Sequence, residues 1–217
     1  MLTFTPEQIQ SIINLRPLID SSFMYNADRW KGLNNNYKDL LKDFENKKNT
    51  RNDVINTFID YYNNKCDFMK AFLLCMVWGF SDTGYGTHRT NKFIETDNNK
   101  SLIKSALDHI NRNEIDSLKN AFFDLKKVDG LGISYLTKVL YFATKAMAID
   151  NYALIFDIKV ARALVKLSAP IEIFEILNIG PSSKYNDYNK YNNQIHTLAK
   201  KYDIDADKIE FYLFNLN

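Results

Sequence analysis

Lys138 and Asp157 lie nineteen positions apart in the sequence, and together they could carry out nucleophilic chemistry. A lysine amine attacks carbon only when it is neutral, and burial among apolar side chains lowers the pKa of an amine. Tyr135, Leu136 and Tyr141 surround Lys138 in the sequence. A carboxylate close to the amine could accept its proton and stabilise positive charge that develops in the reaction. The alternative is a lysine that faces solvent and an aspartate that only caps a helix.

Both residues fall where the sequence predicts helices. An amphipathic pattern predicts a helix from Glu114 to Lys127, and a second helix is expected from Ser134 to about Met147, with Lys138 one turn inside it. An apolar run ends at Asp157, where a further helix is expected to begin. As the N-cap of that helix, Asp157 would be fixed by backbone N–H groups.

The turn between the first two helices contains two glycines, Gly130 and Gly132. Glycines one residue apart let the backbone turn sharply and bring its amides close to a ligand. Free N–H groups at the start of a helix, together with the helix macrodipole, favour an anion. We therefore expect Gly130, Gly132 and Ser134 to bind a phosphate group of DNA. A plain connector between two helices, with glycine as the C-cap of the first, is the alternative.

Taken together, these elements resemble the helix-hairpin-helix DNA glycosylase superfamily, in the branch similar to 8-oxoguanine DNA glycosylases. The resemblance covers roughly residues 114–167 and rests on the motifs Gly130-Leu131-Gly132, Thr137-Lys138 and Asp157-x-x-Val160-Ala161-Arg162. A weaker similarity to bacterial proteins of this branch extends to Trp78-Gly79 and Gly84-Tyr85-Gly86-x-x-Arg89. The set of motifs is more specific than any one of them.

The resemblance implies an all-α fold, with residues 1–217 forming one domain of two helical lobes and the active site between the lobes. In this superfamily the hairpin (here about residues 114–147) grips the phosphate backbone, and the target base is flipped out of the duplex. The aspartate supports cleavage of the glycosidic bond. In bifunctional members a lysine attacks C1′ of the sugar, and the resulting imine permits β-elimination, which nicks the strand. Lys138 and Asp157 would take these two catalytic roles here.

One position departs from the family pattern. In many members the lysine lies two residues after the second hairpin glycine, where this sequence has Ser134. Lys138 lies four residues later, on the same helical face. Either Lys138 takes the role of nucleophile, or Ser134 occupies that position and the enzyme is monofunctional. The spacing between Lys138 and Asp157, which is like that of bifunctional members, favours Lys138.

The segment from Gly79 to Arg89 is expected to form a loop and is the other glycine-rich stretch of the chain. Trp78 and Tyr85 offer aromatic faces, and Arg89 could hold a phosphate. A flipped base needs aromatic faces and hydrogen-bond partners for its edge. We therefore expect Trp78, Tyr85 and Arg89 to form the base pocket. A surface loop above a tryptophan of the core is the alternative.

The rest of the chain also reads as helical, because glycine, proline and alternating apolar patterns are rare. Further helices are expected after Thr5-Pro6, over Trp30 to Lys47, after a cap at Asn52 or Asp53, over Cys66 to Trp78, over Thr96 to His109, around Ile171 to Leu177, and twice near the C-terminus. His109 and His196 are expected at the surface. Tyr185, Tyr188 and Tyr191 could form a nucleic-acid surface or could be half-buried in a polar helix.

Composition excludes several other classes of protein. The longest apolar run, Ala71 to Trp78, is too short to span a bilayer. The two cysteines cannot build a four-cysteine iron–sulfur cluster, and no set of His, Cys and carboxylate residues has the spacing of metal ligands. A formal net charge of +2 argues against a wholly basic surface, but a local basic patch is sufficient for DNA binding.

The sequence therefore predicts a DNA glycosylase, with abasic-site (AP) lyase activity, that needs no metal or organic cofactor. Its expected substrate is double-stranded DNA with a damaged or modified base, and the family resemblance favours an oxidised purine. We expect a monomer that does not bind membranes and that is located in the cytoplasm, associated with the nucleoid when bound to DNA. The alternatives are a non-catalytic helix-hairpin-helix DNA-binding module and a helical protein–protein adaptor.

Overall fold

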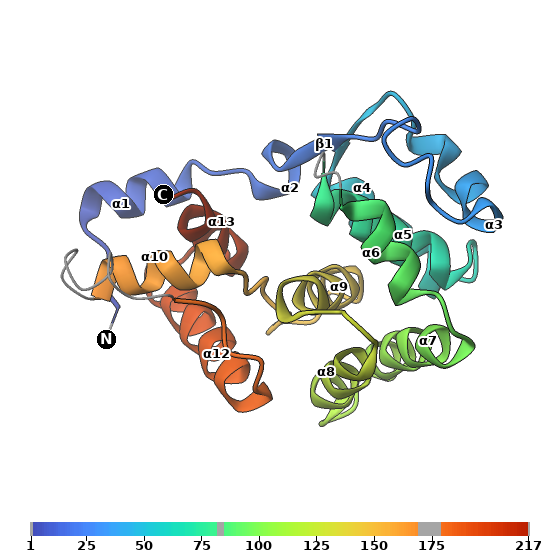
Figure 1. The fold of residues 1–217 in the computed structure, drawn as a ribbon. Coiled ribbons are helices and arrows are strands. Elements are labelled where there is room, and N and C mark those ends of the chain that lie inside the picture. The colour runs from blue at the N-terminus through green and yellow to red at the C-terminus, as the bar shows by residue number, and fades with distance from the viewer. Residues whose placement is uncertain (1, 82–84, 169–178, 217) are drawn as a thin grey trace.

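A computed structural model describes residues 2–81, 85–168 and 179–216, and this part of the chain is mostly helical (Figure 1). The helices are α1 (Pro6–Ile13), α2 (Pro17–Asp20), α3 (Asn35–Lys38), α4 (Arg51–Tyr62), α5 (Phe68–Phe80), α6 (Gly86–Phe93), α7 (Asp97–Arg112), α8 (Ser117–Lys127), α9 (Ile133–Ala146), α10 (Ile158–Ser168), α12 (Tyr185–Tyr202) and α13 (Ala206–Asn215), with a 3-10 helix η1 (Asp39–Phe44). Two short strands, β1 (Ser22–Met24) and β2 (Lys48–Thr50), pair antiparallel. The expected all-α class is confirmed, apart from this small sheet.

Threonine side chains begin several of these helices. Thr5 accepts a hydrogen bond from the backbone N–H of Gln8, and Pro6 occupies the first helical position, as expected. The cap of α4 is Thr50, so the expected cap at Asn52 or Asp53 is wrong. Asp53 instead completes a capping box, because its carboxylate accepts from the Thr50 N–H at 2.7 Å.

The helix expected over Trp30 to Lys47 is wrong. The segment instead forms turns followed by the short helices α3 and η1, and β2 begins directly after it. Asn34 caps α3 with its side chain, which starts a new helix where the predicted one should have continued. Trp30, Leu33 and Leu41 are nevertheless buried, so the apolar spacing reflects burial of these side chains from irregular backbone.

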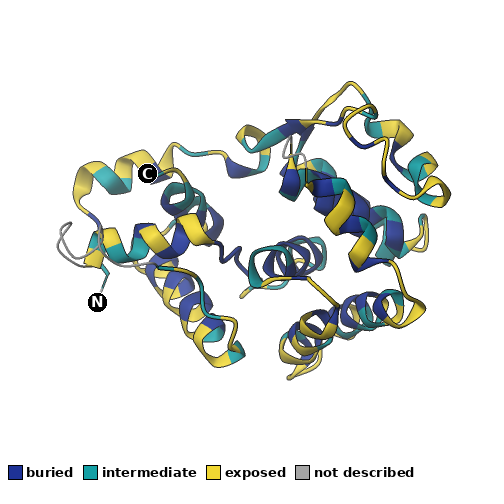
Figure 2. Cartoon of the chain, viewed as in Figure 1, coloured by how far each residue is buried: buried dark blue, intermediate teal, exposed yellow. Residues whose placement is uncertain are grey.

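Helix α9 lies at the centre of the molecule. It packs against α4, α5 and α8, and a continuous run of its residues from Leu136 to Thr144 is buried. In Figure 1, α1, α10, α12 and α13 lie on one side of α9, and α4 to α8 lie on the other. In Figure 2 much of α9 and of α5, which packs against it, is coloured dark blue as buried. A helix in this position can bring side chains from both sides of the molecule together.

The C-terminal part of the chain packs on the region just before α10. Tyr188 and Tyr191 are buried, and their hydroxyls donate to the carbonyl oxygens of Leu154 and Ile155. Packing, and not a nucleic-acid surface, therefore explains these two tyrosines. His196 is also buried, with its Nε2 2.8 Å from the Tyr152 carbonyl oxygen, so its expected surface position is wrong.

Two further expectations concern a short helix after α10 and a membrane-spanning helix. The helix expected around Ile171 to Leu177 lies outside the described residues. None of the helices in the described ranges has both the length and the apolar character that crossing a membrane requires.

Candidate active site

Lys138 and Asp157 meet in the interior, although they belong to different helices. The Nζ atom of Lys138 lies 3.7 Å from Oδ2 of Asp157. Lys138 is 6% exposed and Asp157 is 8% exposed. This geometry excludes the reading of Lys138 as a lysine that faces solvent. It also shows that the aspartate does more than cap a helix, because its second oxygen faces the amine.

The two oxygens of Asp157 have different partners. Oδ1 accepts hydrogen bonds from the backbone N–H groups of Lys159 and Val160, at 2.9 and 3.2 Å, and so caps α10 as expected. Oδ2 is left to face Lys138. The cap fixes the orientation of the carboxylate, so that one oxygen is held toward the amine.

The surroundings of Lys138 favour the neutral amine. Burial lowers the pKa of Lys138 below that of an ordinary lysine, and the Asp157 carboxylate opposes part of that shift. The amine also donates to the carbonyl oxygen of Ser134, at 3.2 Å, and lies 5.2 Å from the centre of the Tyr135 ring. A lysine with a lowered pKa and a neighbouring carboxylate is suited to nucleophilic attack.

A cavity of about 260 Å³ opens beside the Lys138–Asp157 pair. Its lining includes Ser21, Ser22, Phe23, Arg51, Trp78, Gly79, Glu210 and Phe214. A larger hollow of about 490 Å³ lies at the α3–α6 surface, next to His88 and Lys92. We place the candidate site in the smaller cavity, because it contains the buried ionisable groups.

A buried ion pair forms another part of the cavity wall. Arg51 Nη1 lies 2.8 Å from Oε2 of Glu210, and both side chains are almost completely buried. The guanidinium carbon of Arg51 lies 5.1 Å from the ring centre of Trp78 and 5.2 Å from that of Tyr141. In the described residues, neither Arg51 Nε nor Glu210 Oε1 has a hydrogen-bond partner. Unpaired buried polar atoms of this kind are costly and are typical of functional sites.

Sequence reasoning missed Arg51, Glu210 and Phe214. Arg51 and Glu210 are 159 positions apart, and no local pattern connects them. One signal was present. Glu210 lies next to Ile209 on the buried face of α13, where an acidic residue is unexpected unless it is paired.

The predicted hairpin is formed by α8, a turn over residues 128–132, and α9. Gly130 has φ +76°, in the left-handed region that favours glycine. Gly132 is the N-cap of α9 and supplies no side chain to cap the first N–H groups. A Cβ atom added to Gly132 would meet nothing within 4 Å, so no neighbouring group of the protein requires glycine there. The start of α9 is therefore open to an external anion.

Ser134 and Lys138 occupy successive turns of α9. Ser134 is half-buried and contacts Lys138 through its backbone carbonyl oxygen. Lys138, and not Ser134, is among the residues that line the cavity with Asp157. This geometry favours Lys138 over Ser134 as the residue that occupies the nucleophile position.

The three residues expected to form the base pocket are divided between two places. Trp78 lines the Lys138–Asp157 cavity. Tyr85 and Arg89 line a second hollow, of about 440 Å³, together with Phe80 and Tyr135. Tyr85 is 77% exposed.

The segment from Gly79 to Arg89 is not one loop as expected. Helix α5 continues to Phe80, and α6 begins at Gly86, while residues 82–84, with Gly84 of the motif, lie outside the described residues. Close packing explains the two helical glycines. A Cβ atom at Gly79 would lie 3.0 Å from Cδ of Lys138, and one at Gly86 would lie 2.9 Å from Cβ of Phe80.

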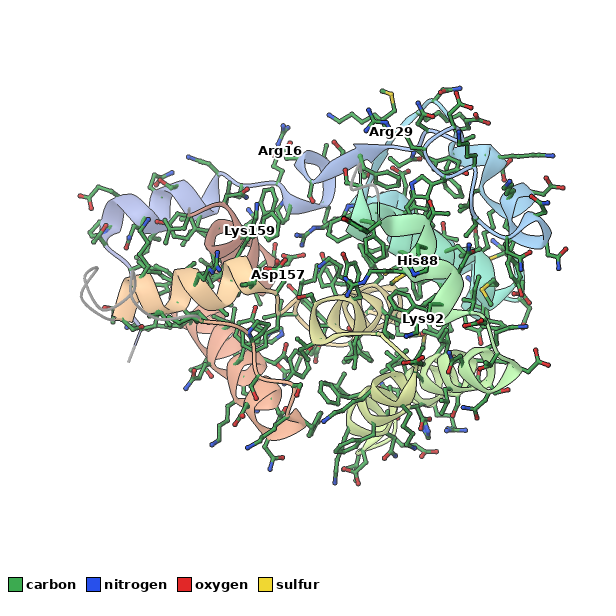
Figure 3. All side chains as sticks on the ribbon, viewed as in Figure 1. Arg16, Arg29, His88, Lys92, Asp157 and Lys159 are labelled. Atoms are coloured by element: carbon green, nitrogen blue, oxygen red, sulfur yellow. The ribbon has the colours of Figure 1, made fainter. Side chains whose placement is uncertain are left out.

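Basic side chains come from several elements. In Figure 3, Lys159 lies beside Asp157 at the start of α10, whereas His88 and Lys92 belong to α6 and line the hollow of about 490 Å³. Lys159 Nζ lies 4.5 Å from the ring centre of Phe214, which lines the cavity. Among the described residues, no group of three or more His, Cys, Asp and Glu side chains is arranged to hold a metal ion.

Comparison with known families gives a match over most of the chain. The family model described as "Putative 8-oxoguanine DNA glycosylase OGG-like protein" matches residues 16–214. No curated protein and no solved structure matches the chain. The matched range contains the hairpin, Lys138, Asp157 and the cavity-lining residues from Ser21 to Phe214. Because the match extends over most of the sequence, and confirms the resemblance carried by the motifs, the protein belongs to the 8-oxoguanine DNA glycosylase OGG-like family.

Proposed function

We propose that the protein is a bifunctional DNA glycosylase, which excises a damaged or modified base from double-stranded DNA and then nicks the strand as an AP lyase. The observation that carries the proposal is the buried pair of Lys138 Nζ and Asp157 Oδ2, 3.7 Å apart beside a cavity. A buried amine with a lowered pKa and a carboxylate fixed beside it are the two groups that this chemistry requires.

Lys138 acts as the nucleophile. Its neutral amine attacks C1′ of the sugar, so a nitrogen–carbon bond forms while the bond from C1′ to the base breaks, and the base leaves with the bonding electrons and gains a proton. Opening of the sugar ring gives an imine between Lys138 and C1′. Loss of a proton from C2′ then expels the 3′ phosphate by β-elimination, which nicks the strand. Hydrolysis of the imine releases Lys138.

Asp157 assists at two points. Its Oδ2 atom accepts the proton that Lys138 loses on attack, because no other carboxylate of the described residues forms an ion pair with that amine. The same negative charge stabilises the positive charge that develops on the sugar as the base leaves. A fixed charge in a buried site stabilises a transition state more than it would in water.

The hairpin and the nearby basic residues hold the DNA backbone. The open N-terminus of α9 at Gly132 and Ser134 suits a phosphate group. Lys159, in the first turn of α10, adds a positive charge beside Asp157. These contacts would clamp DNA across α9, with α4 to α8 and α1, α10, α12 and α13 as the two lobes of one domain (Figure 1).

The extrahelical base enters the cavity beside Lys138, where Trp78 and Phe214 provide aromatic walls. Tyr85 and Arg89 contact the DNA next to it, because their hollow is separate and Tyr85 is exposed. Stacking against an exposed aromatic side chain is a common way to hold an unpaired base. Trp78, Tyr85 and Arg89 therefore remain our proposed base-contacting residues, with Trp78 nearest to the chemistry.

A panel of duplexes, each with one modified base, tests the function directly. We expect excision of at least one modified base, with strand nicking, while an undamaged duplex is left intact. An oxidised purine belongs in the panel, together with alkylated and deaminated bases. Salt-sensitive DNA binding without excision of any base would identify a non-catalytic DNA-binding module. Absence of DNA binding at low salt would identify a protein–protein adaptor.

A further inference from the structure

The segment that carries Asp157 is extended and is held by side chains from two helices. Residues 153–156 belong to no helix or strand, yet each contributes a buried backbone group that is hydrogen bonded to a side chain. Ala153 N donates to Thr144 Oγ1 (2.9 Å), Leu154 N to Asn192 Oδ1 (2.8 Å) and Phe156 N to Thr137 Oγ1 (3.0 Å), while the hydroxyls of Tyr188 and Tyr191 donate to the carbonyl oxygens of Leu154 (3.0 Å) and Ile155 (2.8 Å). We call residues 153–156 the connector.

One of these hydrogen bonds lies directly beside the candidate catalytic pair. Thr137 precedes Lys138 in α9, and Phe156 precedes Asp157. The bond from Phe156 N to Thr137 Oγ1 therefore joins the two chain segments one residue away from both side chains. Thr137 is fully buried, and its hydroxyl proton is engaged with the Ile133 carbonyl oxygen at 2.8 Å, which leaves the oxygen free to accept.

The cap orients the Asp157 carboxylate within its own helix, but it does not join that helix to α9. The Oδ1 atom of Asp157 is held by backbone N–H groups of its own helix, α10, and α10 packs against α13. Lys138 belongs to α9, which packs against α4, α5 and α8. A small rotation of α10 would carry Asp157 away from Lys138 without breaking the cap.

We propose that Thr137 is a positioning residue, whose hydroxyl fixes the start of α10 to α9 and so sets the separation of the Asp157 carboxylate from the Lys138 amine. The inference rests on the proposed function of that pair. It adds a residue that touches neither substrate nor reacting atoms and acts only through Asp157. A misplacement of about 1 Å in an active site can cost on the order of 100-fold in rate.

Thr144 provides a matched control for Thr137. It lies on the same helix and is equally buried, and its hydroxyl donates to a carbonyl oxygen four residues earlier, that of Leu140, at 2.7 Å. It also accepts from a connector N–H, that of Ala153. The two threonines thus make the same pair of bonds, but the Thr144 bond is four residues from Asp157 and the Thr137 bond is one residue away.

The test compares Thr137→Val, Thr137→Ser and Thr144→Val. Valine has nearly the same shape as threonine but cannot accept the hydrogen bond, so both valine variants leave one connector N–H unpaired and should lose similar thermal stability. We expect Thr137→Val to lower single-turnover excision and borohydride trapping of the protein on abasic DNA by 10-fold or more. Thr137→Ser keeps the hydroxyl and should remain within about twofold of the wild type, as should Thr144→Val.

A second readout does not depend on activity. The pKa of Lys138 in the free protein can be measured from the NMR shift of its labelled Nζ atom. The Asp157 carboxylate raises the pKa of Lys138, so Thr137→Val should lower that pKa relative to the wild type, and Thr144→Val should leave it unchanged. The other groups that face Lys138, namely Cys75 of α5, Glu210 of α13 and Arg51 of α4, are the same in all variants.

Equal losses of activity in Thr137→Val and Thr144→Val, with an unchanged pKa of Lys138, would overturn the proposal. Thr137 would then be one of several side chains that hold the connector in place, with no separate effect on Asp157. If the valine variants do not fold, Thr137→Cys and Thr144→Cys make the same comparison with a weaker acceptor. A wild-type protein that neither excises a base nor forms a trapped adduct contradicts the proposed function. In that case the NMR comparison still decides whether Thr137 positions Asp157.

Discussion

The Nζ atom of Lys138 lies 3.7 Å from the Oδ2 atom of Asp157, while Oδ1 of the same carboxylate caps α10. One aspartate thus anchors a helix and faces a buried amine. The arrangement links the chemistry to the fold, because the Asp157 side chain cannot rotate away from Lys138 on its own without uncapping α10. It also allows the two roles to be separated by mutation.

Asp157→Asn should affect activity far more than stability. Asparagine caps helices about as well as aspartate, so at a pH where the Lys138 amine is neutral the free energy of unfolding should fall by no more than about 1 kcal/mol. The amide cannot accept the amine proton or supply negative charge to the transition state, so excision should fall by on the order of 100-fold or more. Chemical denaturation and single-turnover excision measure the two effects. Wild-type excision by Asp157→Asn would remove the carboxylate from the mechanism.

The pH dependence of covalent trapping should report the pKa of Lys138. Only the neutral amine reacts, so the rate should rise with pH through that pKa, which burial lowers below the ordinary lysine value of about 10.4. The Asp157 carboxylate raises the pKa of Lys138. In Asp157→Asn the rising limb of the profile should therefore move to lower pH, although the maximal rate is smaller. If the pH at which the trapping rate rises is unchanged or higher in Asp157→Asn, the Asp157 carboxylate does not raise the pKa of Lys138 as proposed.

Gly132→Val should weaken DNA binding without harming the fold. A Cβ atom at Gly132 meets no neighbour, and φ −71° and ψ 166° suit valine. A branched side chain at the start of α9 would keep a phosphate away, so affinity should fall alike for damaged and undamaged duplexes. Gly180→Val is the matched control, because Gly180 also has open space around it. Titrations at several salt concentrations measure the effect, and equal affinity of both variants would show that the hairpin is only a connector.

Tyr85→Ala and Arg89→Ala should separate base excision from strand nicking. These residues line a hollow apart from the Lys138–Asp157 cavity, and neither is among the groups that shift the pKa of Lys138. Each should reduce excision of the preferred base by about 10-fold, because one stacked base contributes roughly 1–3 kcal/mol. Nicking of a preformed abasic site, where no base has to be held, should remain close to that of the wild type. If both activities fall together, the hollow is better interpreted as a clamp on the DNA backbone.

The sequence predicted Lys138, Asp157 and the hairpin because their signals are local. A glycine pair between two amphipathic patterns, and an aspartate at the end of an apolar run, can be read within a few residues of each position. The structure places Asp157 at the N-cap and Lys138 one turn into α9, as those patterns require. The family match covers residues 16–214, a range that contains these residues.

The remaining parts of the site depend on contacts between distant positions. Arg51 meets Glu210 across 159 residues, and the buried His196 contacts the carbonyl oxygen of Tyr152 across 44 residues. The glycine-rich sequence of residues 79–89 predicts a loop. In the structure Gly79 is helical, and glycine suits that position because a Cβ atom there would lie 3.0 Å from Cδ of Lys138. Local patterns cannot reveal close packing of this kind.

Covalent trapping of Lys138 on DNA tests the central claim most directly. Borohydride reduces an imine between the protein and an abasic-site duplex to a stable adduct. Lys145→Gln is the control, because Lys145 lies on the same helix and forms its own ion pair, 3.0 Å from Asp207. The account predicts an adduct for the wild type and for Lys145→Gln, and none for Lys138→Gln, although all three proteins still bind the duplex. An undiminished adduct in Lys138→Gln would place the nucleophile elsewhere and contradict the account.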